Sequence, residues 1–499
     1  MNEKVRRIEP RRLKGFRDLS GDVVSARERM IAAVRAVYER YGFTPLETPA
    51  LEFVDCLGKF LPESDQPDAG VFSFRDEDEA WVALRYDLTA PLSRYVAMNL
   101  NDLPMPFRRY QVGPVWRVEK PGPGRFREFY QFDFDTVGSA SMLADAEACM
   151  IMSETLEALG IARGDYIIRV NNRKVLNGVL ERVARGDADG GGALDPAAAL
   201  AILRSIDKLD KVGIEGVEQL LGRGRKDESG AFIKGIELLP EQIRLVRDYL
   251  EIRSDSRTGL LSALTGLVEA STVGREGLDE LRQIDEALTA GGFSADRVTF
   301  DSTVVRGLEY YTGPVFEGAL TFEIKDDDGQ VRQFGSVFGG GRYDELVKRF
   351  LGREIPATGA SIGVDRLLSA LTHLGKVSTR TATAPVLVTR LDKTLTAEYQ
   401  RIASELRDAG INAELYVGTQ NIGKQFQYAS RSGKVACIVM GSDELGRGEV
   451  SIKDLRLGEE LSKDVGEDRK RWLEQQPAQA TVPRTQLVEH VRGLLRKWG

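Results

Sequence analysis

Hydrophobic residues recur at helical spacing near the start of the chain, over residues 22–42, and Gly42 ends the pattern. The sequence therefore predicts an amphipathic helix there, and a similar stripe predicts a second helix over residues 143–159. Between and beside these helices lie segments typical of strands, at 81–88, 107–118 and 129–137. Strands in consecutive runs, with helices on either side, favour an antiparallel sheet covered by helices.

The pattern of hydrophobic and polar residues changes in the middle of the chain. Helical patterns with almost no strand signal fill residues 174–295, strand-like aromatic sequence resumes over 298–338, and a helix is predicted at 362–374. After a polar linker, apolar strands alternate with helices, which predicts a parallel β-α-β-α-β unit. Its strands are expected at 386–389, 413–417 and 435–440, and its helices at 395–406 and 422–430.

These patterns predict three parts. The first is an α+β core with an antiparallel sheet and flanking helices, formed by residues 1–173 and 296–376. The second is a helical insertion, residues 174–295, and the third is a C-terminal α/β domain, residues 384–499. A length of 499 residues fits about three domains.

Composition narrows the classes of protein. The chain is 42% hydrophobic and 29% charged, as in globular proteins, and no apolar run is long enough for a membrane span. With 69 basic and 76 acidic residues, a net charge of −7 argues against an indiscriminate nucleic-acid binder. Three scattered cysteines and two histidines exclude a disulfide framework and a metal site built on Cys or His ligands, and they favour a reducing cytoplasm.

One segment matches a phosphate-binding motif only in part. Residues 418–424 match the pattern G-x-x-x-x-G-K between a predicted strand and a predicted helix. Gln425 follows, however, where a phosphate-binding loop needs a Ser or Thr hydroxyl for Mg²⁺. We interpret the segment as an ordinary joint between strand and helix.

Residues 115–135 carry the densest set of candidate groups. They are predicted to form an antiparallel hairpin with a long Pro/Gly loop. Alternation along the second strand places Tyr130, Phe132 and Phe134 on one face. The other face then carries Phe129, Gln131, Asp133 and Asp135. Such a polar face is costly to bury without a ligand, and the alternative is a solvated sheet face.

This hairpin resembles motif 2 of the class II aminoacyl-tRNA synthetases. The resemblance rests on Trp116-Arg-Val-Glu119, the loop and Phe129. Gly359-Ala-Ser-Ile-Gly-Val-Asp-Arg366 resembles motif 3 of that class, with Asp365 where Glu is usual. The helix at 22–42 with the following Pro-containing strand resembles motif 1, which in the family lies at a dimer interface. The resemblance implies a homodimer.

Further segments resemble the histidyl-tRNA synthetases. Arg306-Gly-Leu-Glu-Tyr-Tyr311 is similar to their histidine-specific signature R-G-L-D-Y-Y, with Glu309 replacing Asp. Similar matches are found at Lys14-Gly-Phe-Arg-Asp18, Leu84-Arg-Tyr-Asp-Leu-Thr89 and Phe338-Gly-Gly-Gly-Arg-Tyr-Asp344. Together they cover about residues 9–441.

The resemblance implies a role for each matching residue. Arg117 is expected on the ATP α-phosphate and the histidine carboxylate, with Arg306 on the opposite side, and these two are the candidate catalytic residues. The remaining candidates for histidine are Asp87, Leu88, Thr89, Gln131, Asp135, Tyr310 and Tyr311. The remaining candidates for ATP are Glu119, Arg125, Phe129 and Arg366. From the residues alone, core packing for the two tyrosines and a salt bridge from Arg306 to Glu309 or Asp301 stay open.

The activity implied is that of a histidine–tRNA ligase. It would use ATP with Mg²⁺ to form histidyl-adenylate and transfer histidine to the 3′ end of histidine tRNA. The helical insertion would hold the acceptor arm of the tRNA and the C-terminal domain the anticodon. The alternative is a catalytically inactive, histidine-sensing regulatory relative, which tends to lack the Arg306 signature and the C-terminal domain.

Overall fold

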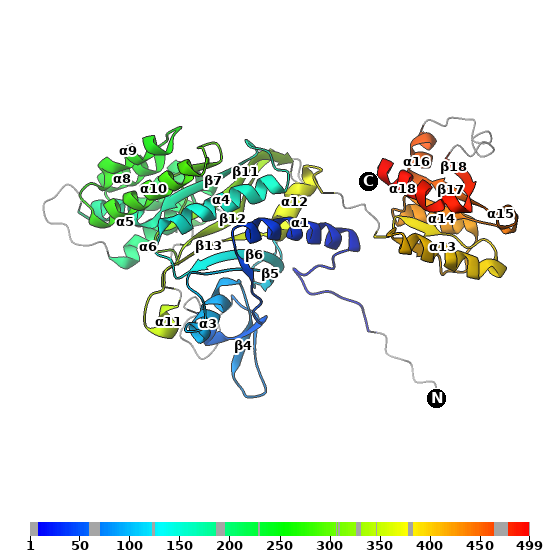
Figure 1. The fold of residues 1–499 in the computed structure, drawn as a ribbon. Coiled ribbons are helices and arrows are strands. Elements are labelled where there is room, and N and C mark those ends of the chain that lie inside the picture. The colour runs from blue at the N-terminus through cyan, green and yellow to red at the C-terminus, as the bar shows by residue number, and fades with distance from the viewer. Residues whose placement is uncertain are drawn as a thin grey trace. The chain divides into compact units, whose positions relative to one another are not determined.

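The structure is a computed structural model that describes residues 8–58, 70–121, 125–185, 195–227, 230–305, 307, 310–325, 331–345, 347–377, 383–463 and 478–498. The chain divides into two compact units. One comprises residues 1–19 and 26–377, and the other comprises residues 20–25 and 378–499. Each unit is considered by itself (Figure 1).

An eight-stranded sheet forms the centre of the larger unit. Its order is β1 (Thr44–Pro45), β5 (Phe107–Trp116), β6 (Glu128–Val137), β13 (Ala357–Gly363), β12 (Val331–Arg342), β11 (Pro314–Lys325), β7 (Tyr166–Asn172) and β10 (Val298–Phe300). The six central strands pair antiparallel, which confirms the sequence-based prediction. Among the described strands of this sheet, only the two edge pairs, β1 with β5 and β10 with β7, are parallel.

Helix α1 (Gly21–Arg40) packs on the apolar side of β6. The ring of Tyr38 lies 4.9 Å from the rings of both Phe132 and Phe134, and all three side chains are buried. This confirms the apolar face that alternation predicted for the second strand of the hairpin. Helices α4 (Met142–Ala158) and α12 (Val364–His373) run beside α1 over the sheet (Figure 1). All three lie within two residues of the predicted bounds.

A smaller layer brings the chain to the site. Strands β2 (Leu51–Phe53), β4 (Trp81–Leu84) and β3 (Ser73–Arg75) form a three-stranded sheet beside α2 (Val54–Leu57) and α3 (Thr89–Asn99). The strand predicted for 81–88 therefore ends at Leu84, and the next residues turn into α3. The short helix α11 (Lys348–Leu351) contacts α3.

Residues 173–290 are mostly helical, as predicted. The helices are α5 (Arg173–Arg185), α6 (Pro196–Ile206), α7 (Leu209–Leu221), α8 (Pro240–Glu251), α9 (Arg257–Val268) and α10 (Thr272–Ala290). A hairpin of β8 (Gly224–Lys226) and β9 (Phe232–Lys234) interrupts them. Sequence analysis missed it because strands of three residues are too short to give a periodic signal.

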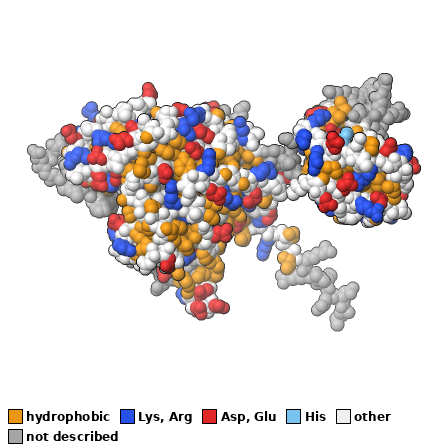
Figure 2. Space-filling model, in the orientation of Figure 1, with side chains coloured by type: hydrophobic (Ala, Val, Ile, Leu, Met, Phe, Trp, Pro, Cys, Tyr) orange, Lys and Arg blue, Asp and Glu red, His pale blue; other side chains and the backbone are white. Residues whose placement is uncertain are grey.

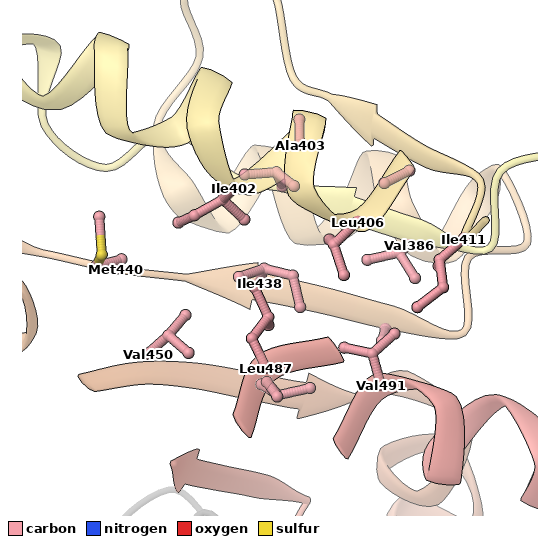
Figure 3. Close-up of a cluster of buried hydrophobic side chains, with 14 of the residues drawn as sticks. Val386, Ile402, Ala403, Leu406, Ile411, Ile438, Met440, Val450, Leu487 and Val491 are labelled. Atoms are coloured by element: carbon pink, nitrogen blue, oxygen red, sulfur yellow. The ribbon is translucent and has the colours of Figure 1, made fainter. Parts of the chain in front are cut away.

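The second unit holds a mixed sheet in the order β15 (Ala413–Leu415), β14 (Val386–Val388), β16 (Ala436–Val439), β17 (Glu449–Asp454) and β18 (Gln479–Pro483). The first three strands are parallel, as predicted, whereas β17 and β18 add antiparallel strands that were not predicted. The helices are α13 (Thr396–Asp408), α14 (Ile422–Arg431), α15 (Ser442–Arg447), α16 (Leu455–Lys463) and α18 (Leu487–Trp498). Figure 3 shows the core between α13, this sheet and α18, with Ile402, Ile438 and Leu487 pointing toward one another.

The motif at 418–424 is a strand-to-helix joint, as interpreted. The side chain of Asn421 caps α14 by accepting a hydrogen bond from the Lys424 N–H over 3.1 Å. Gln425, at the position that would need a hydroxyl, is buried and binds the main chain of Arg390 through both ends of its amide. Its side chain is therefore committed to the fold.

Among the helices that the structure describes, none is both long enough and apolar enough to cross a bilayer.

Candidate functional site

The polar face of β6, which carries Gln131, Asp133 and Asp135, forms the floor of the site and is called the acid floor below. Asp133 and Asp135 are each only 2% exposed, so this is not the solvated face that sequence analysis left open. Gln131 Oε1, Asp133 Oδ1 and Asp135 Oδ2 are all buried, and none has a hydrogen-bond donor among the described residues. Buried acceptors are nearly always satisfied in folded proteins. Three together on one strand face point to a ligand that donates hydrogen bonds there.

Arg109 on β5 stands directly opposite Asp135. Its side chain is fully buried, and its Nη2 lies 2.7 Å from Asp135 Oδ2. The N–H does not point at this oxygen, so the contact is a charge pair and Oδ2 keeps its capacity to accept a hydrogen bond. Nη2 also donates to the main-chain oxygen of Leu88 over 3.0 Å. Sequence analysis missed Arg109, because only the strand register reveals its position.

Three tyrosines form one wall. Tyr343 donates its hydroxyl hydrogen to Asp135 Oδ1 and stacks on Tyr310, with the ring centroids 5.2 Å apart. Tyr310 in turn meets Tyr311 edge to face at 5.1 Å. Both signature tyrosines also pack against the apolar cluster around α3. Tyr310 therefore serves both as a core residue and as a neighbour of the acids. Tyr343, which sequence analysis named only within the 338–344 signature, joins them.

Glycines make room for the Tyr311 ring. A Cβ atom on Gly341 would lie 2.8 Å from Tyr311 Cδ1, and one on Gly307 would lie 2.1 Å from Cδ2. Gly307 also has a φ of 61°, which favours glycine. The glycine of the 306–311 signature and the last glycine of the 338–344 signature thus support the same side chain.

Asp87, Leu88 and Thr89 lie where the chain enters α3. Asp87 Oδ1 accepts hydrogen bonds from the N–H groups of Thr89 and Ala90, at 3.2 and 2.9 Å. These bonds fix the carboxylate at the start of the helix, as helix-capping acids do. Leu88 is buried, and its carbonyl is the group that Arg109 binds. The structure therefore brings the three residues of this loop to the acid floor through Arg109.

Burial dominates the electrostatics. It raises the pKa of Asp133 to about 7, with Arg109 opposing the shift and Asp135 adding to it. Burial also raises the pKa of Asp87 and of Asp135, and the charge of Arg109 opposes both shifts. Three carboxyl groups thus share the guanidinium of Arg109, which cannot neutralise all of them. A cationic or N–H-donating ligand would supply the missing counter-charge.

Arg117 lies next to this acidic region. Its Nε donates to the Tyr86 carbonyl over 3.1 Å, and its charge opposes the burial that raises the pKa of the neighbouring Asp87. The guanidinium carbon is 5.1 Å from the centroid of Phe129, which lies one strand away on β6. The Arg117 guanidinium and the Phe129 ring therefore lie together between the acid floor and the hairpin loop. The N–H groups of a guanidinium are donors that bind phosphate or carboxylate.

Arg366 lies in the first turn of α12. It is exposed and donates to the Phe334 carbonyl over 2.7 Å. Its neighbour Asp365 accepts a hydrogen bond from the Tyr130 N–H over 2.8 Å and one from Arg17 Nη2 over 2.6 Å. These bonds tie the start of α12 to the residue after Phe129. The structure thereby brings the start of α12 to β6, the two segments that resemble motifs 3 and 2.

The remaining candidates lie at the rim or outside the description. The side chains of Glu119 and Arg125 are exposed, and the Glu119 carbonyl accepts a hydrogen bond from Arg127 Nε over 3.1 Å. Arg306 and Glu309, with loop residues 122–124, lie outside the described residues. No group of three or more His, Cys, Asp or Glu residues in the described part of the chain is arranged to hold a metal ion.

Comparison with known families gives two matches. The family model described as histidyl-tRNA synthetase matches residues 15–367. The model described as anticodon binding domain matches residues 385–492.

Relatives match almost the entire chain. A histidine–tRNA ligase from Cereibacter sphaeroides is 54% identical over 490 residues, which is 97% of each chain. One from Rhizobium meliloti is 51% identical over 501 residues, covering 99% of this chain and 98% of the relative. The crystal structure of histidyl-tRNA synthetase from a Nostoc species has a TM-score of 0.74 at 31% identity, covering 97% of this chain and 99% of that one.

Proposed function

We propose residue roles for the reaction of this chain, which belongs to the histidyl-tRNA synthetase family. The protein is a histidine–tRNA ligase, an ATP-dependent aminoacyl-tRNA synthetase. The alternative of an inactive histidine-sensing regulator finds no support, since relatives named histidine–tRNA ligase match the chain over nearly its full length.

The histidine site is built on the acid floor. Asp135 would accept the imidazole N–H, with Tyr311 as a second polar partner and Tyr310 as the wall. Asp87 would bind the ammonium group, beside Leu88 and Thr89, and Gln131 would lie between the two ends. The observation that carries this proposal is the row of buried acceptors on β6 that lack donors among the described residues. A site that must hydrogen-bond its substrate can reject analogues without those groups by roughly 10⁴-fold.

The nucleotide site would lie on the hairpin side. Phe129 would stack on the adenine, with Glu119 and Arg125 at its edge, and Arg366 would hold the γ-phosphate. The cation–ring pair of Arg117 and Phe129 supports this placement, because it puts a phosphate-binding guanidinium beside an aromatic face. The tie between Asp365 and Tyr130 would hold Arg366 near the same nucleotide.

Activation is a displacement at phosphorus. A carboxylate oxygen of histidine attacks the α-phosphorus of ATP, the bond from that phosphorus to the bridging oxygen breaks, and pyrophosphate leaves with the electron pair. Arg117 and Arg306 would neutralise the charge on the α-phosphoryl group from opposite sides. No side chain forms a covalent bond, so positioning and electrostatic stabilisation carry the step.

The second step transfers histidine to tRNA. A hydroxyl oxygen of the 3′-terminal ribose attacks the histidyl carbonyl carbon, and AMP leaves. No described side chain offers itself as the base, and a phosphate oxygen would take the hydroxyl proton. The anticodon-binding domain would hold the anticodon, and the helices of residues 173–290 would hold the acceptor arm.

Mg²⁺ would enter with ATP. The described residues contain no acidic, His or Cys cluster able to hold a metal alone, which fits an ion that takes most of its ligands from phosphates and water. Bound there, Mg²⁺ would neutralise the β- and γ-phosphate oxygens.

An apolar surface on the larger unit supports a homodimer. Leu51, Phe53, Phe74 and Met98, around β2, β3 and α3, are 44 to 72% exposed. A groove of about 450 Å³ runs beside them and is lined by Leu51, Phe53, Tyr95 and Met98 among others. Figure 2 shows hydrophobic side chains gathered over the lower part of the larger unit in that view, where β3, β4 and α3 lie. A patch of this kind marks an interface, and we assign it to a second copy of the chain.

The three cysteines support a reducing cytoplasmic location. Cys56, Cys149 and Cys437 are all free thiols, and Cys149 and Cys437 are buried. Free thiols without a disulfide framework are typical of proteins in a reducing compartment.

Histidine-dependent exchange of pyrophosphate into ATP tests the activation step. The wild-type protein should exchange with histidine and not with phenylalanine, and absence of exchange from folded protein would favour the regulator. Arg306→Ala should lower the exchange rate far more than the affinity for histidine, because Arg306 is assigned to the transition state. A change confined to histidine affinity would refute that role.

A further inference from the structure

Arg109 has no role in the reaction as described so far, yet it lies at the centre of the acid floor. Its Nη2 contacts Asp135 on one side and the Leu88 carbonyl on the other, at 2.7 and 3.0 Å. These contacts belong to the two ends of the site, since Asp135 is assigned to the imidazole and the loop around Leu88 to the ammonium group. One nitrogen of this guanidinium therefore links the two ends of the proposed histidine site.

The position is poorly explained by stability alone. Arg109 Nε and Nη1 are buried and have no hydrogen-bond acceptor among the described residues. Unsatisfied buried donors weaken a fold, and a buried ion pair is often replaced by apolar residues without loss of stability. A buried guanidinium with two unsatisfied nitrogens therefore points to a role in the site.

We propose that Arg109 is a positioning residue that sets the spacing between the imidazole and ammonium ends of the histidine site by holding Asp135 and the Leu88 carbonyl together. This inference rests on the proposed histidine site. Lysine is not expected to substitute, because its ammonium group lies on a flexible stem, whereas the planar guanidinium fixes the directions in which Nη2 meets both partners.

The same contact bears on the ionisation of Asp135. Arg109 is the basic group that favours the ionised carboxylate, whereas Asp87 on the α3 loop opposes it. Tyr343, after β12, donates a hydrogen bond to the ionised form. Asp133, Tyr310 and Tyr38 on α1 also face this carboxylate. Loss of the guanidinium charge would raise the pKa of Asp135. On acidification, the Asp135 carboxylate would then be protonated, and would stop accepting the imidazole N–H, at a higher pH than in the wild type.

Steady-state pyrophosphate exchange with Arg109→Lys and Arg109→Gln tests the proposal. Both variants should raise the KM for histidine roughly tenfold to hundredfold, the effect of losing one hydrogen bond to a charged group, with the KM for ATP unchanged. In Arg109→Gln, the rise of this KM on acidification should also begin at a higher pH than in wild type. Using the same substrate for both proteins cancels the titration of histidine itself.

Arg257→Lys is the matched control. Arg257 on α9 is equally an interior arginine, paired with Asp285 at 2.5 Å and bound to the carbonyls of Phe293 and Val298. Its replacement should lower the melting temperature without changing the KM for histidine.

Each outcome separates this inference from the proposed function. No histidine-dependent exchange by the wild type would refute the proposed function itself. An active wild type with folded Arg109 variants of unchanged histidine KM would overturn the role of Arg109 alone, as would an equal rise in both KM values. If Arg109→Gln does not fold, Arg109→Lys decides, and failure of both to fold would overturn the proposal in favour of a structural role.

Discussion

Asp365 and Tyr130 are joined across 235 residues of chain, with the Tyr130 N–H donating to Asp365 Oδ2 over 2.8 Å. The other oxygen of this carboxylate pairs with Arg17, so the N-terminal segment, β6 and α12 meet at one side chain. Glutamate is the residue that the resemblance leads one to expect here. The shorter aspartate fits because both partners already lie within hydrogen-bond distance of its carboxylate.

Asp365→Asn should destabilise the larger unit by about 1 to 2 kcal/mol, because the amide loses the charge that Arg17 binds. It should also raise the KM for ATP, since Arg366 is the next residue. Asp18→Asn is the control, as its pair with Arg12 is exposed and worth about 0 to 1 kcal/mol. Urea unfolding measures the difference, and equal effects of the two variants would contradict the joining role of Asp365.

Asp133→Asn should change the pH dependence of stability. The folded-state pKa of Asp133 is raised to about 7, so the folded protein binds a proton that the unfolded chain releases near pH 4. Wild-type stability therefore falls as pH rises between these values. The asparagine variant should match the wild type near pH 4 and exceed it at pH 8. Melting curves across this range test the sign, and a variant less stable at pH 8 would refute it.

Gly341→Ala should lower the melting temperature, because the new methyl group would lie 2.7 Å from the Pro314 carbonyl and 2.8 Å from the Tyr311 ring. Such overpacking costs about 1 to 3 kcal/mol. Gly339→Ala, two residues earlier on β12, is the matched control, since no atom lies within 4 Å of its added Cβ. Thermal melting of both variants should separate them, and an equal loss of stability would show that Tyr311 does not require this glycine.

Gln425→Ser would complete the phosphate-binding consensus of residues 418–424 without creating a phosphate site. The serine cannot reach the main chain of Arg390, so we expect a loss of about 1 to 3 kcal/mol in stability. Gln420→Ser, at an exposed position, should be neutral. Calorimetric titration with ATP should give the wild-type dissociation constant. Tighter ATP binding by the variant would contradict the interpretation of residues 418–424 as a strand-to-helix joint.

Alternation alone predicted the two faces of β6. Phe132 and Phe134 had to point away from Gln131, Asp133 and Asp135, whatever the rest of the fold, because successive side chains in a strand alternate. The glycine-bearing signatures were also visible, although their shared support of Tyr311 was not. Local pattern and motif therefore predicted the fold class and most candidate residues.

Pairings between distant residues could not be predicted in the same way. Arg109 lies opposite Asp135 only because of the register of a hairpin with a long loop, and such a loop does not fix register. Tyr343 reaches Asp135 from just after β12, far along the chain. Strand β17 shows the opposite case, because buried Val450 and Ile452 alternate along its sequence and could have revealed it.

The strand order β5, β6, β13 has a consequence for synthesis on the ribosome. Asp135 has Arg109 on one side from the local hairpin, but its other neighbour is Gly359 of β13. A nascent chain that ends before Ala357 carries every acid of the floor with one edge of β6 still unpaired. The helices of residues 173–290 emerge during that interval. The proposed histidine site can therefore be completed only after β13 has been made, while the C-terminal unit is still to be synthesised.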